Sequence, residues 1–152
     1  MALGRREDIL VRLMEILEAV QGYSAVARNR GDMDQNRRPA LVLLDGDETS
    51  NLNGSGRGRV KMSPAIVTMR PQVFILLKTT RPQNEDVGTD LNTRRGVIIS
   101  AIADDAALIT LLGPNGGIAY EGCETDLKSG GSLEGQMRLD FALTTTLNPY
   151  AN

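Results

Sequence analysis

Two aspartates one residue apart follow an apolar run in the first half of the chain. Asp45-Gly46-Asp47-Glu48-Thr49 comes directly after Leu41–Leu44 and fits the pattern D-x-D-x-T. In phosphoryl transfer, one carboxylate of such a pair attacks phosphorus and its neighbour handles the proton, while Mg²⁺ neutralises the phosphate charge. The same carboxylates would also suit Mg²⁺ without that chemistry, or would be solvated residues of a turn that ends the strand.

The pattern is that of haloacid-dehalogenase-type phosphatases, and their fold makes demands on the rest of the sequence. Their doubly wound parallel sheet sends the motif strand into a helical crossover, whereas the glycine-rich loop Thr49–Arg59 follows here. The acid pair that should complete the magnesium site would have to be Asp104-Asp105. These two residues lie inside a helical pattern, where they are typical of a helix cap. We therefore interpret the motif as structural and expect no catalytic residue, no metal and no cofactor.

Residue types on which other catalytic sites usually depend are missing from the sequence. The chain has no histidine, the commonest general base and a common metal ligand. The single cysteine, Cys123, lacks the usual base as a nucleophile and cannot form an intrachain disulfide. The segment MALGRREDIL has no signal-peptide pattern, and the apolar runs are too short or too interrupted by charge to span a bilayer. We expect a soluble intracellular protein with no membrane contact.

Size and composition predict one domain with an aliphatic core. The chain has 152 residues, of which 41% are hydrophobic and only 3% aromatic, so we treat residues 1–152 as a single domain. The net charge of −2 does not favour nucleic-acid binding, and few aromatic rings are available to stack on bases.

Charge is distributed unevenly along the chain. The segment Arg57–Arg81 holds six basic residues and no acid, whereas the chain from Pro82 onward holds four basic residues and ten acids. The uneven charge marks either solvated faces or complementary patches that meet between copies of the protein. The candidate interface residues are Arg57, Arg59 and Lys61 on the basic side and Glu121, Glu124 and Asp126 on the acidic side.

Hydrophobic periodicity predicts the element order helix, strands, helix, strands. The predicted elements are a helix over Arg5–Val20, a short strand over Ala25–Arg28, a strand over Ala40–Leu44, a mostly extended segment over Val60–Thr79, a helix in two pieces over Asp90–Leu112, and strands over Gly117–Glu121 and Gln136–Thr146. Asp104 is the expected cap of the second helical piece. Pro64 and Pro71 indicate bulges or an exposed edge. The sequence therefore predicts an α+β fold: a mainly antiparallel sheet with two helices packed on one face, and the loop Thr49–Arg59 between two strands.

Several phrases in this order resemble one protein family. They are REDILVRLMEIL, VARNR, RPALVLLDGDE, MSPAIVTMRPQVFILL, LNTRRGVIISAIADDAALITLL, GIAYEG and GQMRLDFALTTTL. Together they cover most of the chain, and they resemble the tail terminator proteins of long-tailed bacteriophages, the minor tail proteins of the U type.

The resemblance implies an α+β subunit of a hexameric ring without enzymatic activity or cofactor. Such a ring sits on the last ring of tail tube protein, stops tube growth and offers a surface to the head–tail connector protein. The ring is assembled in the host cytoplasm and is part of the tail or neck of the virion. DNA only passes through its channel. Asp45, Asp47 and Glu48 would then be turn residues near the channel, where negative charge keeps passing DNA from sticking.

Two alternatives stay open at this point. A neighbouring head–tail connector or tail-completion protein would have similar size and symmetry. A small Mg²⁺-dependent phosphatase would use the D-x-D-x-T motif, and its expected solution state is an active monomer rather than an inactive ring.

Overall fold

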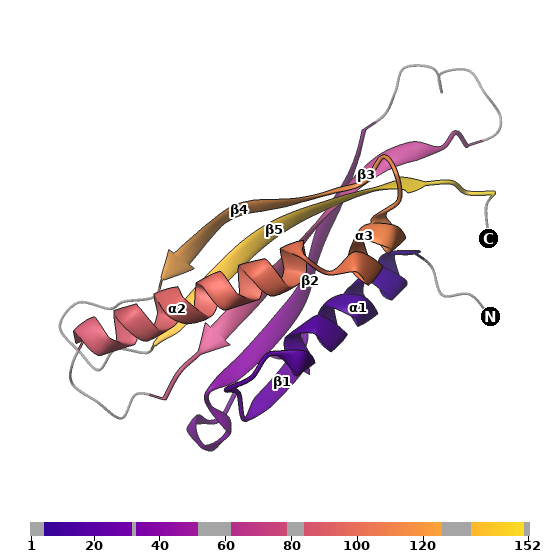
Figure 1. Cartoon of the computed structure of the whole chain (residues 1–152). Helices are drawn as coiled ribbons and strands as arrows, with labels where there is room; N and C mark the ends of the chain where they lie inside the picture. Colours follow the sequence, from indigo (N-terminus) through magenta and orange to yellow (C-terminus); the bar gives the residue numbers. More distant parts are fainter. Residues whose placement is uncertain (1–4, 32, 52–61, 79–83, 126–134, 151–152) are drawn as a thin grey trace.

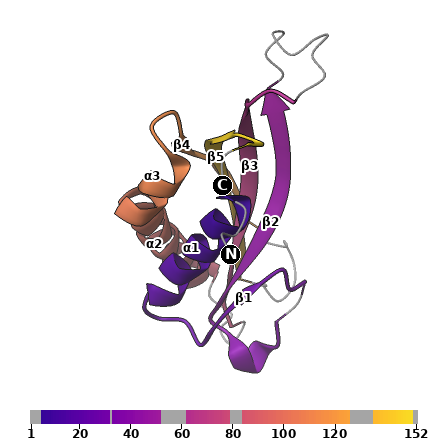
Figure 2. The ribbon, with the colours of Figure 1, turned by 90° about the vertical axis from the view of Figure 1, so that its right-hand side faces the viewer.

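One open five-stranded sheet with three α-helices on a single face makes up the described part of the fold (Figures 1 and 2). The computed structural model describes residues 5–31, 33–51, 62–78, 84–125 and 135–150 of the chain. The elements in chain order are α1 (Arg5–Ala19), β1 (Ala25–Arg28), the 3-10 helix η1 (Gln35–Arg37), β2 (Ala40–Asn51), β3 (Ala65–Leu76), α2 (Asn84–Ala103), α3 (Ala106–Leu112), β4 (Gly117–Thr125) and β5 (Gln136–Leu147). The strand order is β1-β2-β3-β5-β4, in which β1 runs parallel to β2 and the other neighbours are antiparallel.

The predicted α+β class and mainly antiparallel sheet are confirmed, with differences at element ends. The second helical region is two separate helices, so three α-helices rather than two cover the sheet in the described part of the chain. α2 begins at Asn84, earlier than the predicted Asp90. β2 continues to Asn51, well past the predicted end at Leu44. The start of the predicted loop, Thr49–Asn51, is therefore strand, and the rest of that loop lies outside the described residues.

The main core lies between the sheet and the α-helices and is almost wholly aliphatic, and a smaller cluster of Met33, Ala40, Val42 and Leu76 is buried on the opposite face of the sheet. α1 buries Ile9, Leu10, Leu13, Ile16 and Leu17, which recur at the three- and four-residue spacing of one helix face. In β5 the predicted alternation is confirmed, because every second side chain is buried beneath the helices. These β5 residues are Met137, Leu139, Phe141 and Leu143.

A proline within a central strand determines the course of β2. Pro71 belongs to β3, which pairs on both sides, with β2 and with β5. Proline has no N–H to donate to a strand ladder and is tolerated inside a sheet at bulges. The pairing of β2 jumps here from Leu44 opposite Gln72 to Asp47 opposite Arg70, so two residues of β2 face one residue of β3. The bulge predicted from the prolines is confirmed for Pro71, whereas an exposed edge is wrong for it.

The second of the two bulged residues must be glycine. Gly46 has a φ of 73°, in the left-handed region. A Cβ on Gly46 would lie 1.8 Å from the carbonyl oxygen of Arg70 and 3.2 Å from the nitrogen of Pro71. The central glycine of the D-G-D motif is therefore explained by the close approach of two backbones.

Beyond the helices, the sheet continues as a three-stranded extension. β1 pairs with β2 only as far as Leu43, and β4 pairs with β5 only as far as Thr144. The hairpin of β2 and β3 projects past the helix layer (Figures 1 and 2). We call residues 49–51, 62–68 and 146–150 the arm. Its β2 part is exposed at every position.

Gly46→Ala tests the bulge. We expect it to lower the free energy of unfolding by at least about 2 kcal/mol, because the new methyl group meets backbone atoms of Arg70 and the φ is strained. Gly88→Ala is the matched control, because its Cβ would enter open space on α2, and we expect it to stabilise by about 0.5–1 kcal/mol. Urea unfolding measures both variants; equal stability of Gly46→Ala and wild type would contradict the bulge.

Candidate functional site

The first aspartate of the D-x-D-x-T motif is held by an arginine from the neighbouring strand. The Arg28 guanidinium donates to both oxygens of Asp45, at 2.7 and 2.9 Å, and to both oxygens of Glu7 on α1, at 2.8 and 2.9 Å. The backbone N–H of Asp45 also donates to the Asn29 side chain, at 3.0 Å. The hydrogen bonds from Arg28 hold the pKa of Asp45 below its usual value, although partial burial acts in the opposite direction.

The other acids of the motif lie on two sides of the sheet. Glu48 is on the helix side, where Arg6 of α1 approaches it to 3.5 Å and also donates to the carbonyl oxygen of Gly46 at 2.9 Å. Asp47 lies opposite Arg70, whose alternation with buried neighbours places it on the uncovered face of the sheet. Within the described residues, Asp47 forms no salt bridge.

This geometry corrects the expectation that Asp45, Asp47 and Glu48 are turn residues. All three belong to β2, because the bulge opposite Pro71 lets the strand continue through the motif. Asp45 turns toward β1 and α1 whereas Asp47 lies on the other face, so the two carboxylates do not converge on one ion or phosphorus. Among the described residues, no group of three or more metal-ligating side chains is found. Of the three acids expected near a channel, only Asp47 lies on the uncovered face.

A second aspartate joins two helices. Asp105 accepts a hydrogen bond from the backbone N–H of Leu108 at 2.8 Å and so caps α3. The same carboxylate receives two bonds from Arg12 of α1, at 2.9 and 2.6 Å, which lower the pKa of Asp105. The predicted cap, Asp104, is wrong, because Asp104 follows the end of α2 and donates its N–H to the carbonyl oxygen of Ser100, whereas Asp105 caps α3.

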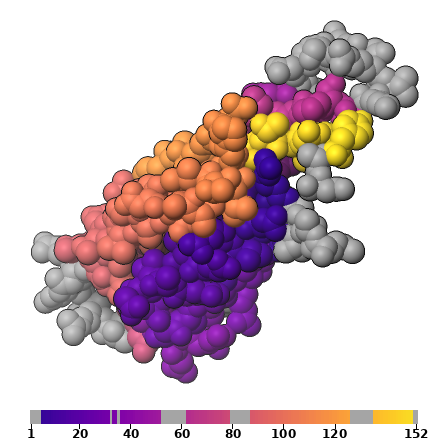
Figure 3. All heavy atoms as spheres, turned by 45° about the vertical axis from the view of Figure 1, so that its right-hand side comes forward, coloured from indigo at the N-terminus to yellow at the C-terminus, as the bar shows by residue number. Residues whose placement is uncertain are grey.

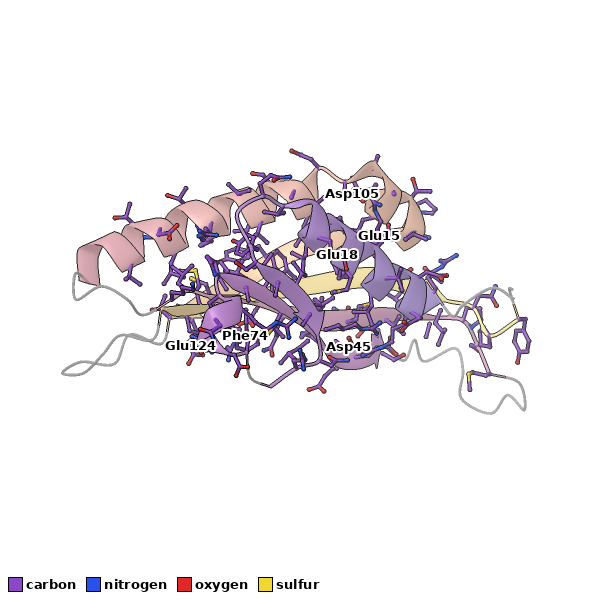
Figure 4. All side chains as sticks on the ribbon, turned by 90° about the horizontal axis from the view of Figure 1, so that it is seen from below. Glu15, Glu18, Asp45, Phe74, Asp105 and Glu124 are labelled. Carbon is purple, nitrogen blue, oxygen red and sulfur yellow. The ribbon has the colours of Figure 1, made fainter. Side chains whose placement is uncertain are left out.

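Polar side chains form cross-strand rows on the uncovered sheet face. Figure 4 shows Glu124 and Phe74 on the side of the sheet away from Asp105 and the helices. One row joins Thr49, Arg70 and Glu121 through contacts of 2.9 and 3.4 Å. The other joins Gln72, Asp140, Arg138 and Glu124 through contacts of 3.2, 2.9 and 3.0 Å. This face is therefore charged, but its charges are largely paired within the subunit.

The sequence-predicted interface residues are only partly described. Glu121 and Glu124 already pair with Arg70 and Arg138 of their own chain. Both pairs are exposed, and such pairs contribute only about 0.2–1 kcal/mol, so exchange for a neighbour's arginine would change little. Arg57, Arg59, Lys61 and Asp126 lie outside the described residues.

The outward side of α2 and α3 is a surface that the charge pattern did not predict. With the exception of Asp104 between the two helices, its exposed residues from position 96 to 110 carry no charge. We call these residues the helix surface: Gly96, Val97, Ser100, Ala103, Ala106, Ala107, Ile109 and Thr110. Val97 and Ile109 are about half exposed, at 52% and 51%. The lack of charge on this surface is visible in the sequence, because segments 96–103 and 106–120 contain no charged residue.

The arm is a second charge-free surface. Its described segments, TSN, MSPAIVT and TLNPY, contain no charged residue. Four of its apolar side chains are exposed, namely Met62, Ile66, Leu147 and Tyr150. Ile66 pairs with Thr146 and Leu147 with Ala65, so these two side chains lie on opposite faces of the arm. Exposed large apolar side chains on a projecting element are typical of protein contact sites.

Comparison with known proteins assigned no family. A scan against protein-family models found no match, and a search of curated proteins found none either. None of the described helices is long and apolar enough to cross a membrane.

Asp45→Asn tests the ion pair. Because the folded-state pKa of Asp45 is below its unfolded value, its contribution is present above the unfolded pKa and lost as pH falls through the folded one. We expect the variant to be less stable than wild type by about 1–3 kcal/mol at pH 7, and the difference to shrink below about pH 4. The matched control Asp47→Asn should stay within about 0.5 kcal/mol. Chemical denaturation from pH 2.5 to 7 decides; equal losses in the two variants would contradict the assignment.

Proposed function

We propose that this chain is a tail terminator, a structural protein that forms a ring on the end of a bacteriophage tail tube. The ring stops polymerisation of the tube protein and offers a joining surface to the head–tail connector. The observation that carries the proposal is the arm, which presents apolar, uncharged side chains beyond the core of its own subunit. A subunit with such an arm is better suited to an oligomer than to a monomer, because association would bury the exposed apolar side chains.

The phrases on which the family resemblance rests coincide with structural features of the subunit. RPALVLLDGDE spans most of β2 with its bulge, and MSPAIVTMRPQVFILL spans the 62–68 part of the arm and the rest of β3 with Pro71. LNTRRGVIISAIADDAALITLL spans most of α2 and all of α3, including the Asp105 cap. These phrases thus encode the bulge, parts of the arm and the helix surface, and this supports the proposal of a structural role.

A structural role also accounts for the acids of the motif. Asp45 and Glu48 bind Arg28 and Arg6 and so fasten β2 to β1 and α1. The proposal assigns Asp47 to the uncovered sheet face, together with Asp140 and Glu124. There it would add negative charge to a channel through which DNA passes without binding.

The direct test is to add the purified chain to polymerising tail tube protein. We expect tubes that stop growing and carry a ring at one end in negative-stain images, because a cap removes the surface on which the next tube ring forms. The paired variant Ile66→Asp with Leu147→Asp should fail to cap the tubes, since it places charge on the arm. Glu18→Lys, an exposed change on α1, is the control and should cap like wild type.

Unchanged tube growth would count against the terminator role. If the chain leaves tube length unaltered but binds completed tails or the connector, the neighbouring connector role replaces it.

A phosphatase assay addresses the remaining alternative. We expect no Mg²⁺-dependent hydrolysis of an aryl phosphate by the wild-type chain, because Asp45 is bound by Arg28 and Asp47 lies on the other face. Turnover that disappears in Asp45→Ala and survives in Glu18→Lys would overturn the structural interpretation of the motif.

A further inference from the structure

A small pocket lies on the sheet face opposite the α-helices. On the helix side, α1, α2 and α3 cover the sheet closely (Figure 3). On the opposite face, the buried side chain of Met33, which precedes η1, packs on the smaller apolar cluster. The pocket lies beside this cluster and encloses about 110 Å³. Its apolar lining comes from the paired strands β2 and β3, namely Val42, Leu44, Phe74 and Leu76.

Two arginines and an amide form the polar lining of this pocket. Arg38 is only 8% exposed, and it donates through Nε to the carbonyl oxygen of Met33 at 3.1 Å and through Nη1 to that of Leu77 at 3.4 Å. Within the described residues, its Nη2 has no hydrogen-bond acceptor and no carboxylate forms a salt bridge with it. Arg30 is exposed and likewise has no salt bridge to a described residue. Gln136 contributes its side-chain amide.

The missing carboxylate sets these two arginines apart. In the described part of the chain, six other arginines form salt bridges: Arg6, Arg12, Arg28, Arg70, Arg94 and Arg138. A guanidinium as buried as that of Arg38 is rarely left without an opposite charge, because little water reaches it. A carboxylate that entered the pocket would pair this charge and accept the free N–H groups.

We propose that this pocket binds the side chain of a glutamate presented by a protein partner. The carboxylate accepts hydrogen bonds from Arg38 and Arg30, and the methylene groups lie against the apolar lining from Leu44 and Phe74. A phosphate or sulfate would meet the same arginines but would leave four apolar side chains without an apolar contact. The ligand class is therefore a carboxylate on a short apolar stem.

The size of the pocket favours one side chain over a whole small molecule. Pockets for small molecules enclose roughly 300–1,000 Å³, which is well above the volume here. A single side chain anchored in a pocket is the usual centre of a protein interface. The inference goes beyond the proposed ring and does not depend on it, because every lining residue belongs to one subunit.

Titration of the labelled full chain with two blocked peptides tests the pocket. The probes are acetyl-Ala-Glu-Ala-amide and acetyl-Ala-Gln-Ala-amide, so that the glutamate side chain is the only carboxylate. We expect the glutamate peptide to shift the NMR signals of the Gln136 side-chain amide and the Arg38 Nε–H until they saturate. The glutamine peptide should bind at least about tenfold more weakly, because a neutral amide does not pair the guanidinium charge.

Two exposed arginines of the same part of the chain give a matched pair of variants. Arg30 lines the pocket, whereas Arg37 of η1 does not. Arg30→Gln should raise the dissociation constant of the glutamate peptide about threefold or more, and Arg37→Gln should change it by less than about 1.5-fold. Both side chains are exposed, so the fold should stay intact. Substitution of Arg38 would also remove two bonds to the backbone, so Arg30 carries the test.

Each contrary outcome identifies what is wrong with the inference. Equal binding of the two peptides, or equal effects of the two substitutions, overturns it. Binding of butyrate at least tenfold tighter than of the glutamate peptide would assign the pocket to a free short-chain acid instead. Asp32 lies outside the described residues, and binding by Asp32→Asn alone would assign the pocket to the chain's own aspartate. None of these results alters the tube-capping test of the proposed function.

Discussion

The two-against-one pairing between β2 and Pro71 is the constraint on which the rest of the structure depends. Pro71 in the central strand β3 cannot donate a hydrogen bond to the strand ladder, and the bulge of β2 at Gly46 accommodates the missing bond. Because β2 then resumes pairing at Asp47, it runs on past the helices to Asn51 and forms the arm. The bulge also turns Asp45 toward Arg28, where an ion pair fastens the bulged strand to β1 and α1.

Ion pairs and hydrogen bonds within the subunit use several of its arginines. Arg12 joins α1 to α3 through Asp105, and Arg94 and Arg95 bind groups of the subunit's own body. Exposed pairs of this kind contribute little to stability one by one. The exposed residues from position 96 to 110, apart from Asp104, and the described segments of the arm carry no charge, whereas the sheet face opposite the α-helices carries both paired charges and a small apolar cluster. Surfaces without charge are the ones that association buries at least cost.

Periodicity was sufficient to predict the class of fold and most of the elements, because one-sided burial shows directly in α1 and β5. Element ends were harder to predict. The acids of β2 are typical of a turn by local propensity, and only the pairing with Pro71, distant in sequence, keeps them in a strand. Asp104 and Asp105 are equivalent as caps by residue type, and the contact with Arg12 on another helix distinguishes them. Contacts between residues distant in sequence cannot be predicted from a local pattern of residue types.

The proposed function requires that copies of this chain assemble into a closed ring. The most direct measurement is the mass of the purified protein in solution by sedimentation equilibrium over a wide concentration range. The ring predicts one species of about six copies whose mass stops rising once it has formed. A monomer at all concentrations, or a polymer whose mass keeps rising with concentration, would contradict it.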